Sequence, residues 1–312
     1  MEYQSLDDFP LETLYFRNGT EVDPYDHRCK LGIPGGSQGI HTFQLVWALL
    51  CAAQALFLFS KWPKVGWEAM YMPCCEALSY GLLSSGYGYM KLHGEFHYLP
   101  WIRYAAWIVT TPVLLNQVQG MIDIKIGSLR LAPIQSLANL IMIIMGVSAH
   151  LQENHAWKWL FFFVGCVMCA VIYYIAWLQF AKVNELYAAT KTEIGDKVCF
   201  QLKLIMFCFY VGWSMFSVIW LLSSEGLCLI EEHISAAAHI PGDILSKNSF
   251  GLLMWYTRWI TLGGAWDINK FLEKQAKEKA EAVLTPAEKR KAIMKQAEAC
   301  FSMADACLQQ AN

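Results

Sequence analysis

The sequence carries little charge. Only 16% of its 312 residues are Asp, Glu, Lys or Arg, the net charge is −2, and 56% of the residues are hydrophobic. A soluble protein of this length would carry more charge. The near-neutral balance gives no reason to expect a nucleic-acid partner. The composition therefore predicts an integral membrane protein, with the lipid bilayer as its surroundings.

Two further signals are missing. The first forty residues are polar and acidic and lack the apolar core of a secretory signal peptide. No cluster of His and Cys has the spacing of a zinc site, so no metal is expected. The N-terminal segment holds a glycosylation sequon at Asn18, which is usable only if this end is translocated.

Seven apolar segments of about 20 residues or more match the length that crosses roughly 30 Å of hydrocarbon. They cover residues 41–62, 67–91, 99–122, 132–151, 156–182, 198–223 and 234–262. We therefore expect an all-α membrane protein with a bundle of seven transmembrane helices. Residues 1–40 form an N-terminal segment, 41–265 the helical domain, and 266–312 a tail rich in helix formers.

Charge in the loops predicts the topology. Lys and Arg gather after the first, third and fifth segments, whereas the opposite loops carry mainly Glu. The positive-inside rule then places the N-terminus outside and the tail in the cytoplasm. Of the eleven cysteines, only Cys29 and Cys228 fall in segments placed outside, where disulfides form, so we expect these two to pair.

The seventh segment contains two charges that an apolar helix should not have, Asp243 and Lys247. Residues four apart share one face of a helix, and charge inside a bilayer marks a functional site. One interpretation is a buried structural ion pair. The other is a lysine that carries a covalently bound aldehyde beside a carboxylate counterion. The spacing alone favours neither.

Two motifs resemble microbial rhodopsins. The stretch GDILSKNSFGLL at 242–253 resembles their seventh helix, and RYAAWIVTTP at 103–112 is similar to the RYADWLFTTP of bacteriorhodopsin. The resemblance implies that all-trans retinal forms a Schiff base with Lys247 and that Asp243 is its counterion. It also implies a pocket in which Trp107 and Trp213 sandwich the polyene and Phe216 lies near it. Thr111, Met142 and Gly146 would line the rest.

Ala106 stands where a proton pump of this family has its aspartate acceptor, and Gln117 stands where the proton donor would be. Alanine cannot take a proton, so outward proton pumping is not expected. Asp243 is then the only evident counterion, and we expect it to be ionised in the dark.

The stretch WEAMYMPCCE at 67–76 resembles the second helix of channelrhodopsins, more closely that of the cryptophyte anion channelrhodopsins. This implies a homodimeric light-gated channel for chloride and other small anions. Glu76 is the single carboxylate on a helix face that also carries Ser79, Tyr80, Leu83 and Tyr87, whereas cation channels of this kind carry several. The resemblance places Gln54, Glu76, Arg103 and Asn248 near pore constrictions, and Tyr89 and Glu232 near the outer mouth.

Three alternatives stay open: a light-gated cation channel, a light-driven chloride pump and a sensory rhodopsin. No catalytic domain is expected after residue 265, so we expect no enzyme.

Overall fold

The computed structural model describes residues 16–17, 20–21, 38–61, 66–91, 98–152, 154–227, 229–264, 266, 273 and 294. The chain divides into two units, Met1–Trp266 and Asp267–Asn312. All of the helices and strands discussed below lie in the first unit. The predicted helical tail falls almost wholly outside the described residues.

The described residues form seven helical rods. Six are single helices: α3 (Gln38–Phe59), α4 (Trp67–Ser84), α5 (Trp101–Gln119), α6 (Leu131–Leu151), α7 (His155–Ala188) and α8 (Glu193–Leu222). The seventh is continuous but changes its hydrogen-bond pattern along its length, through α9 (Glu232–Asp243), η2 (Ile244–Ser249), α10 (Phe250–Trp255) and η3 (Tyr256–Thr261). The fold class expected from the sequence is confirmed: a rhodopsin-like bundle of seven helices.

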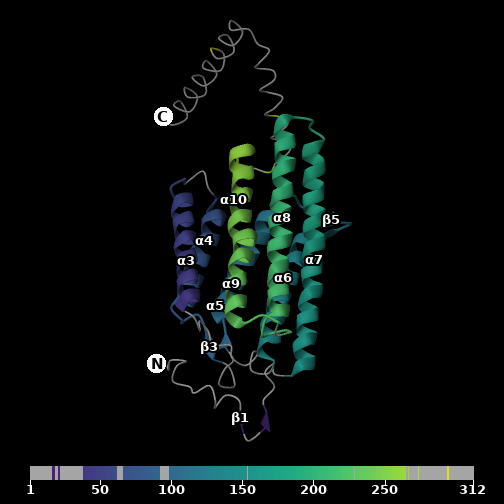
Figure 1. The fold of residues 1–312 in the computed structure, drawn as a ribbon. Helices are drawn as coiled ribbons and strands as arrows, with labels where there is room; N and C mark the ends of the chain where they lie inside the picture. Colours follow the sequence, from purple (N-terminus) through teal and green to yellow (C-terminus); the bar gives the residue numbers. More distant parts are fainter. Residues whose placement is uncertain are drawn as a thin grey trace, which may run out of the picture. The chain divides into compact units, whose positions relative to one another are not determined.

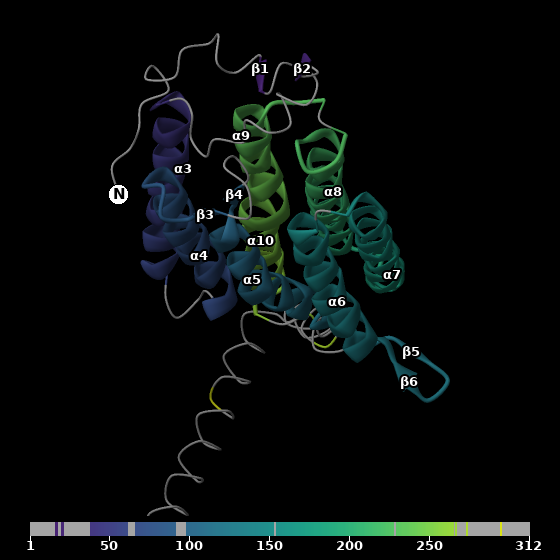
Figure 2. The same cartoon turned by 90° about the horizontal axis from the view of Figure 1, so that it is seen from below.

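The rods lie side by side with their long axes running in similar directions (Figure 1). Each helix from α3 to α8 packs against the next, and α9 packs against both α8 and α3, which closes the bundle (Figure 2). Three short antiparallel hairpins connect or precede helices: β1 (Phe16–Arg17) with β2 (Thr20–Glu21), β3 (Met90–Lys91) with β4 (Tyr98–Leu99), and β5 (Lys125–Ile126) with β6 (Leu129–Arg130).

Helix boundaries depart most from the prediction in α4, α7 and α8. Helix α4 ends at Ser84, not near residue 91, because Gly86 takes a positive φ of 80° and begins a turn. Tyr87 therefore leaves the helix face expected for it and is exposed. Helices α7 and α8 extend beyond their apolar segments by several polar residues at the ends that face each other in the chain.

Among the residues that the structure describes, hydropathy and length alone identify four helices that could cross a membrane: α3, α6, α7 and α8. The other three rods carry buried polar side chains, among them Glu76 in α4, Arg103 in α5 and Lys247 in η2. These side chains lower the hydropathy of the helices that contain them. The same three helices contribute the buried charged side chains of the site described next.

The seventh rod changes from α-helical to π-helical hydrogen bonding around Lys247. Pro241 has no N–H to donate to the preceding turn, and residues Ile244–Ser249 that follow adopt π-helical hydrogen bonding. Helix α8 approaches this turn at Gly212, where a Cβ atom would lie 2.6 Å from the backbone nitrogen of Ser246. Glycine at this position allows the close approach of α8 to η2.

Candidate functional site

Lys247 lies in the centre of the bundle, with 3% of its surface exposed. Its Nζ lies 2.5 Å from Oδ1 of Asp243, one helical turn earlier, and 2.7 Å from Oε1 of Glu76 on α4. Both carboxylates are buried as well. The hydroxyl of Tyr80 donates to the other oxygen of Asp243 at 2.5 Å. Four side chains from α4 and the seventh rod thus form one buried polar cluster.

The expectation that Asp243 is the only evident counterion is too narrow. Glu76 reaches the same nitrogen from a position 171 residues away in the chain. Two ionised carboxylates beside one cation would leave one buried negative charge uncompensated, which is costly. A proton held by one member of the cluster removes that cost.

Ala106 is buried on α5, and its methyl group offers no acceptor to the cluster. The neighbouring Thr110 donates to the backbone carbonyl of Ala106 at 2.7 Å, one turn earlier on the same helix. The second carboxylate at Lys247 therefore comes from α4 and not from the α5 position at which pumps carry theirs.

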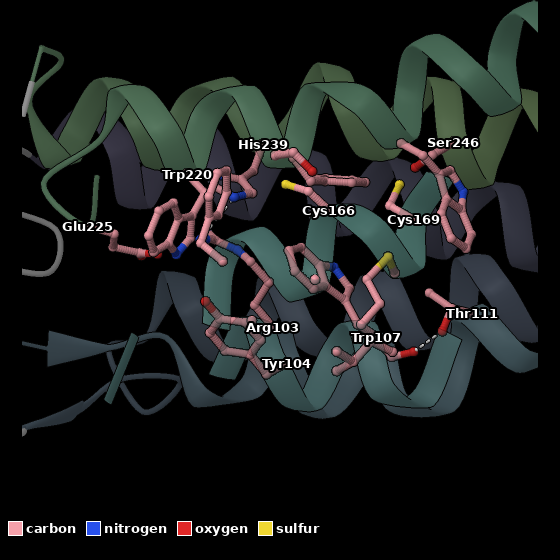
Figure 3. A pocket seen from close by; sticks show the side chains of 18 of the residues that line it. Arg103, Tyr104, Trp107, Thr111, Cys166, Cys169, Trp220, Glu225, His239 and Ser246 are labelled. Atoms are coloured by element: carbon pink, nitrogen blue, oxygen red, sulfur yellow. Dashed lines mark hydrogen bonds between the residues drawn. The ribbon is translucent and has the colours of Figure 1, made fainter. Parts of the chain in front are cut away.

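A cavity inside the bundle has Lys247 among its lining residues, and Figure 3 shows side chains that surround it. Its lining is mainly apolar and aromatic, and it includes each pocket residue expected from the sequence: Trp107, Thr111, Met142, Gly146, Trp213, Phe216 and Lys247. The indole of Trp107 lies 5.0 Å from the ring of Phe216, and the Lys247 amine lies 5.7 Å from that ring. A buried amine in a mainly apolar and aromatic cavity suits a polyene aldehyde. That these lining residues contact retinal stays a prediction.

Several residues that line this cavity were not expected from the sequence, and three of them carry chemically distinctive side chains. The first two are Cys166 and Cys169 on α7, which point into it in Figure 3. The third is His239 on α9, four residues before Asp243. A residue one turn from a known site residue could have been found from helical spacing, whereas nothing in the α7 sequence distinguishes its cysteines from ordinary apolar packing.

Thr111 is tied to helix α6. Nδ2 of Asn139 donates to the Thr111 hydroxyl at 2.8 Å, and that hydroxyl donates to the carbonyl of Trp107 at 2.8 Å. Asn139 has 1% of its surface exposed. Asn139, which was also not expected from the sequence, holds the wall of the cavity in place through a hydrogen bond between α5 and α6.

One end of the cavity is polar. Arg103 and His239 face each other there, with Arg103 Nη1 3.4 Å from His239 Nε2. Close by, Nδ1 of His150 on α6 lies 2.8 Å from Oε1 of Glu225, and the His150 ring packs edge-on against Tyr104. Figure 3 shows Arg103, Tyr104, Glu225 and His239 gathered at this end.

The residues expected along the pore lie in several places. Gln54 is half-buried on α3, and Asn248 is buried on η2, near Cys51 of α3. Tyr89, in the turn after α4, accepts a hydrogen bond from Gln44 at 3.3 Å. Glu232 is the first residue of α9.

The hydroxyls of Ser79 and Tyr80, on the same face of α4 as Glu76, donate hydrogen bonds within the protein. Ser79 donates to the backbone carbonyl of Cys75 at 2.7 Å, and Tyr80 donates to Asp243. Asn18, Cys29 and Cys228 lie outside the described residues, so the sequon and the disulfide stay predictions.

Comparison with known proteins agrees with this geometry. The profile of the bacteriorhodopsin-like protein family matches residues 39–261. A halorhodopsin of Haloarcula marismortui is 29% identical over 222 residues, which cover 68% of this chain and 75% of that protein. Bacteriorhodopsin of Halobacterium salinarum is 27% identical over 181 residues, or 58% of this chain and 63% of that protein.

Solved structures share the fold. The red light-activated channelrhodopsin Chrimson superposes with a TM-score of 0.62 at 20% identity, covering 78% of this chain and 84% of that one. Halorhodopsin, described as a light-driven chloride pump, superposes with a TM-score of 0.57 at 18% identity, covering 71% and 95%. The profile match spans the whole helical bundle and includes the buried lysine, so the chain belongs to the bacteriorhodopsin-like family of microbial rhodopsins, integral membrane proteins with a retinal chromophore.

Proposed function

We propose that this protein is a light-gated anion channel, with chloride among the ions it conducts and all-trans retinal on Lys247 as its chromophore. One observation carries the proposal. Glu76 is the only carboxylate on the buried face of α4, and it is already paired with Lys247. A cation path would need a row of available negative charges there.

Retinal fits the site because the cavity is lined by the amine-bearing Lys247 and by mainly apolar and aromatic side chains. Bound retinal supplies light absorption and a change of shape at its Schiff base with Lys247. Asp243 and Glu76 hold the nitrogen of Lys247 from two directions, and Tyr80 fixes the orientation of Asp243.

The cluster joins two helices that must separate for a path to open. Its contacts run from Lys247 on η2 to Glu76 on α4, and from Asp243 on α9 back to Tyr80 on α4. If the nitrogen of Lys247 turns, it cannot keep both carboxylates at hydrogen-bond distance. The loss of either contact weakens the tie between α4 and the seventh rod, which gives the bundle two alternative arrangements.

Positive charge near this path favours anions. Arg103 is buried on α5 with 7% of its surface exposed. A buried guanidinium attracts a partly dehydrated chloride and repels cations, and the low polarity of the surroundings strengthens both effects. The residues proposed to line the path are Gln54, Glu76, Ser79, Tyr80, Tyr89, Arg103, Glu232 and Asn248.

We place the channel in the cell membrane with its N-terminus outside and its C-terminus in the cytoplasm, as a homodimer. The same topology allows glycosylation at Asn18 and the disulfide between Cys29 and Cys228.

A light-driven chloride pump is the second candidate. Two observations favour it: several relatives are halorhodopsins, and Ala106 replaces the proton acceptor, which a chloride pump also lacks. A pump and a channel differ in whether current flows against the gradient.

Whole-cell recording of the full chain, supplied with retinal, separates the candidates. We expect light to evoke currents that reverse at the chloride equilibrium potential and follow it when external chloride is replaced. Lys247→Ala, which has no amine for retinal, is the control and should give no current. Reversal that tracks sodium, potassium or protons would reject anion selectivity, and a light-driven current that never reverses would establish a pump.

A further inference from the structure

His239 is a buried side chain of the cavity to which the proposed function assigns no role. It lies on α9 with 6% of its surface exposed, one turn before Asp243. It lines the cavity together with Arg103, Trp107 and Phe216. Each part of its imidazole, both nitrogens and the ring face, has a neighbour.

The partners of the two ring nitrogens define the form of this histidine. Nδ1 lies 2.8 Å from the backbone oxygen of Ser235, which can only accept, so Nδ1 carries the hydrogen. Nε2 faces Nη1 of Arg103 at 3.4 Å, and a guanidinium can only donate. Nε2 must therefore present its lone pair. The geometry corresponds to a neutral imidazole that accepts a hydrogen bond from Arg103.

The ring face meets the aromatic wall of the retinal cavity. His239 stacks on Phe216 with ring centres 5.9 Å apart and 28° between the planes, and it lies 6.3 Å from Trp107 at 30°. Trp107 and Phe216 contact each other at 5.0 Å, and Phe216 lies 5.7 Å from the amine of Lys247. A displacement of either aromatic ring must move or tilt the imidazole packed on it.

We propose that His239 is the positioning residue that couples the retinal cavity to Arg103. The ring of His239 packs on the aromatic wall, and its Nε2 accepts a hydrogen bond from the guanidinium of Arg103. A movement of the aromatic rings therefore moves the guanidinium, which is the positive charge proposed to lie in the anion path. This coupling rests on the proposed channel function. The hydrogen bond between His239 and Arg103 does not, and it can be tested separately.

Nitrogen-15 solid-state NMR of the full chain in lipid vesicles tests the bond. With labelled histidine, we expect one neutral imidazole with a protonated Nδ1, whose signals disappear in His239→Gln. In Arg103→Gln the Nε2 signal should move toward that of an imidazole without a charged donor. A protonated Nε2 at His239, or an Nε2 signal that does not change in Arg103→Gln, would overturn the proposal.

Photocurrents of two matched variants test the coupling. In His239→Gln, the side-chain amide reaches the position of Nε2 and can accept from Arg103. In His239→Asn, the amide reaches only the position of Nδ1. Both lose the ring, so a purely structural role would affect them equally. We expect the chloride current of the Gln variant to exceed that of the Asn variant about tenfold, the size expected for one hydrogen bond to a charged group.

Equal currents at the wild-type level would overturn the coupling, because neither the ring nor its Nε2 would then matter. Equal loss in both variants would show that the current depends on the ring and not on the acceptor for Arg103, which overturns the role assigned to Nε2. If the wild-type protein passes no anion current at all, the channel function fails and the coupling to an anion path fails with it. The NMR result then decides whether His239 positions Arg103.

Discussion

Gly212 is the point at which α8 passes closest to the π-helical turn that carries Lys247, and its replacement by alanine is a direct test of that packing. A Cβ atom there would lie 2.6 Å from the nitrogen and 2.8 Å from the Cα of Ser246. Favourable contacts between carbon atoms lie at about 3.5–4.0 Å. Helix α8 and η2 would have to separate by about 1 Å to accommodate the methyl group.

The expected cost follows from that separation. Overpacking of a tight interface costs about 1–3 kcal/mol, and alanine returns up to about 1 kcal/mol through its better helix propensity. We expect a net loss of about 1–2 kcal/mol. Since Ser246 precedes Lys247, the same separation should displace the amine and slow the formation of pigment after retinal is added.

Thermal unfolding of the reconstituted protein at a fixed heating rate provides the measurement, with Gly81→Ala as the control. No atom lies within 4 Å of the position of a Cβ at Gly81, which is also inside a helix of the bundle. Gly81→Ala should be as stable as the wild type or slightly more stable. If Gly212→Ala is as stable as the Gly81 variant and forms pigment at the wild-type rate, the packing of α8 on η2 is not as described.

Other substitutions test the contacts of the site one at a time. Asp243→Asn removes a buried charge from the Schiff base, and because breaking a buried ion pair costs about 3–5 kcal/mol, we expect a shifted absorption spectrum or a deprotonated fraction. An unchanged spectrum rejects Asp243 as a counterion. Asn139→Leu removes the donor to Thr111 at 2.8 Å, and we expect it to lower the free energy of unfolding by about 1 kcal/mol; unchanged thermal unfolding would show that this bond contributes nothing. Glu225→Gln leaves His150 without its buried carboxylate partner at 2.8 Å, and we expect a loss of about 3 kcal/mol in the same assay, whereas a stability equal to that of the wild type would mean that the pair is not charged.

Several features could be predicted from the sequence because they depend on local spacing. Asp243 and Lys247 are four residues apart, which places them on one helix face without any knowledge of the fold. Apolar segments predicted seven rods, although only four of the described helices are identified as possible membrane spans by hydropathy and length. The motif around Trp107 places the aromatic wall on α5, and the absence of a carboxylate at Ala106 follows from the sequence alone.

Other features required the tertiary structure. Glu76 lies 171 residues from Lys247 in the chain, and only the packing of α4 against the seventh rod brings the second carboxylate to the amine. His239 and Arg103 meet across 136 residues, and Asn139 reaches Thr111 from another helix. None of these contacts leaves a pattern in a short stretch of sequence, because side chains on different helices are brought together by helix rotation and depth in the bundle.

The amino-acid sequence by itself determined that the chain forms membrane-spanning helices and carries a lysine suited to retinal. The tertiary structure decided which groups surround that lysine: a carboxylate from α4, a tyrosine that holds Asp243, and a histidine between the aromatic wall and Arg103. The physical reason is that backbone hydrogen bonds and hydrophobic periodicity act over a few residues. A buried charge, in contrast, needs compensating partners, and these come from other helices only once the bundle has assembled.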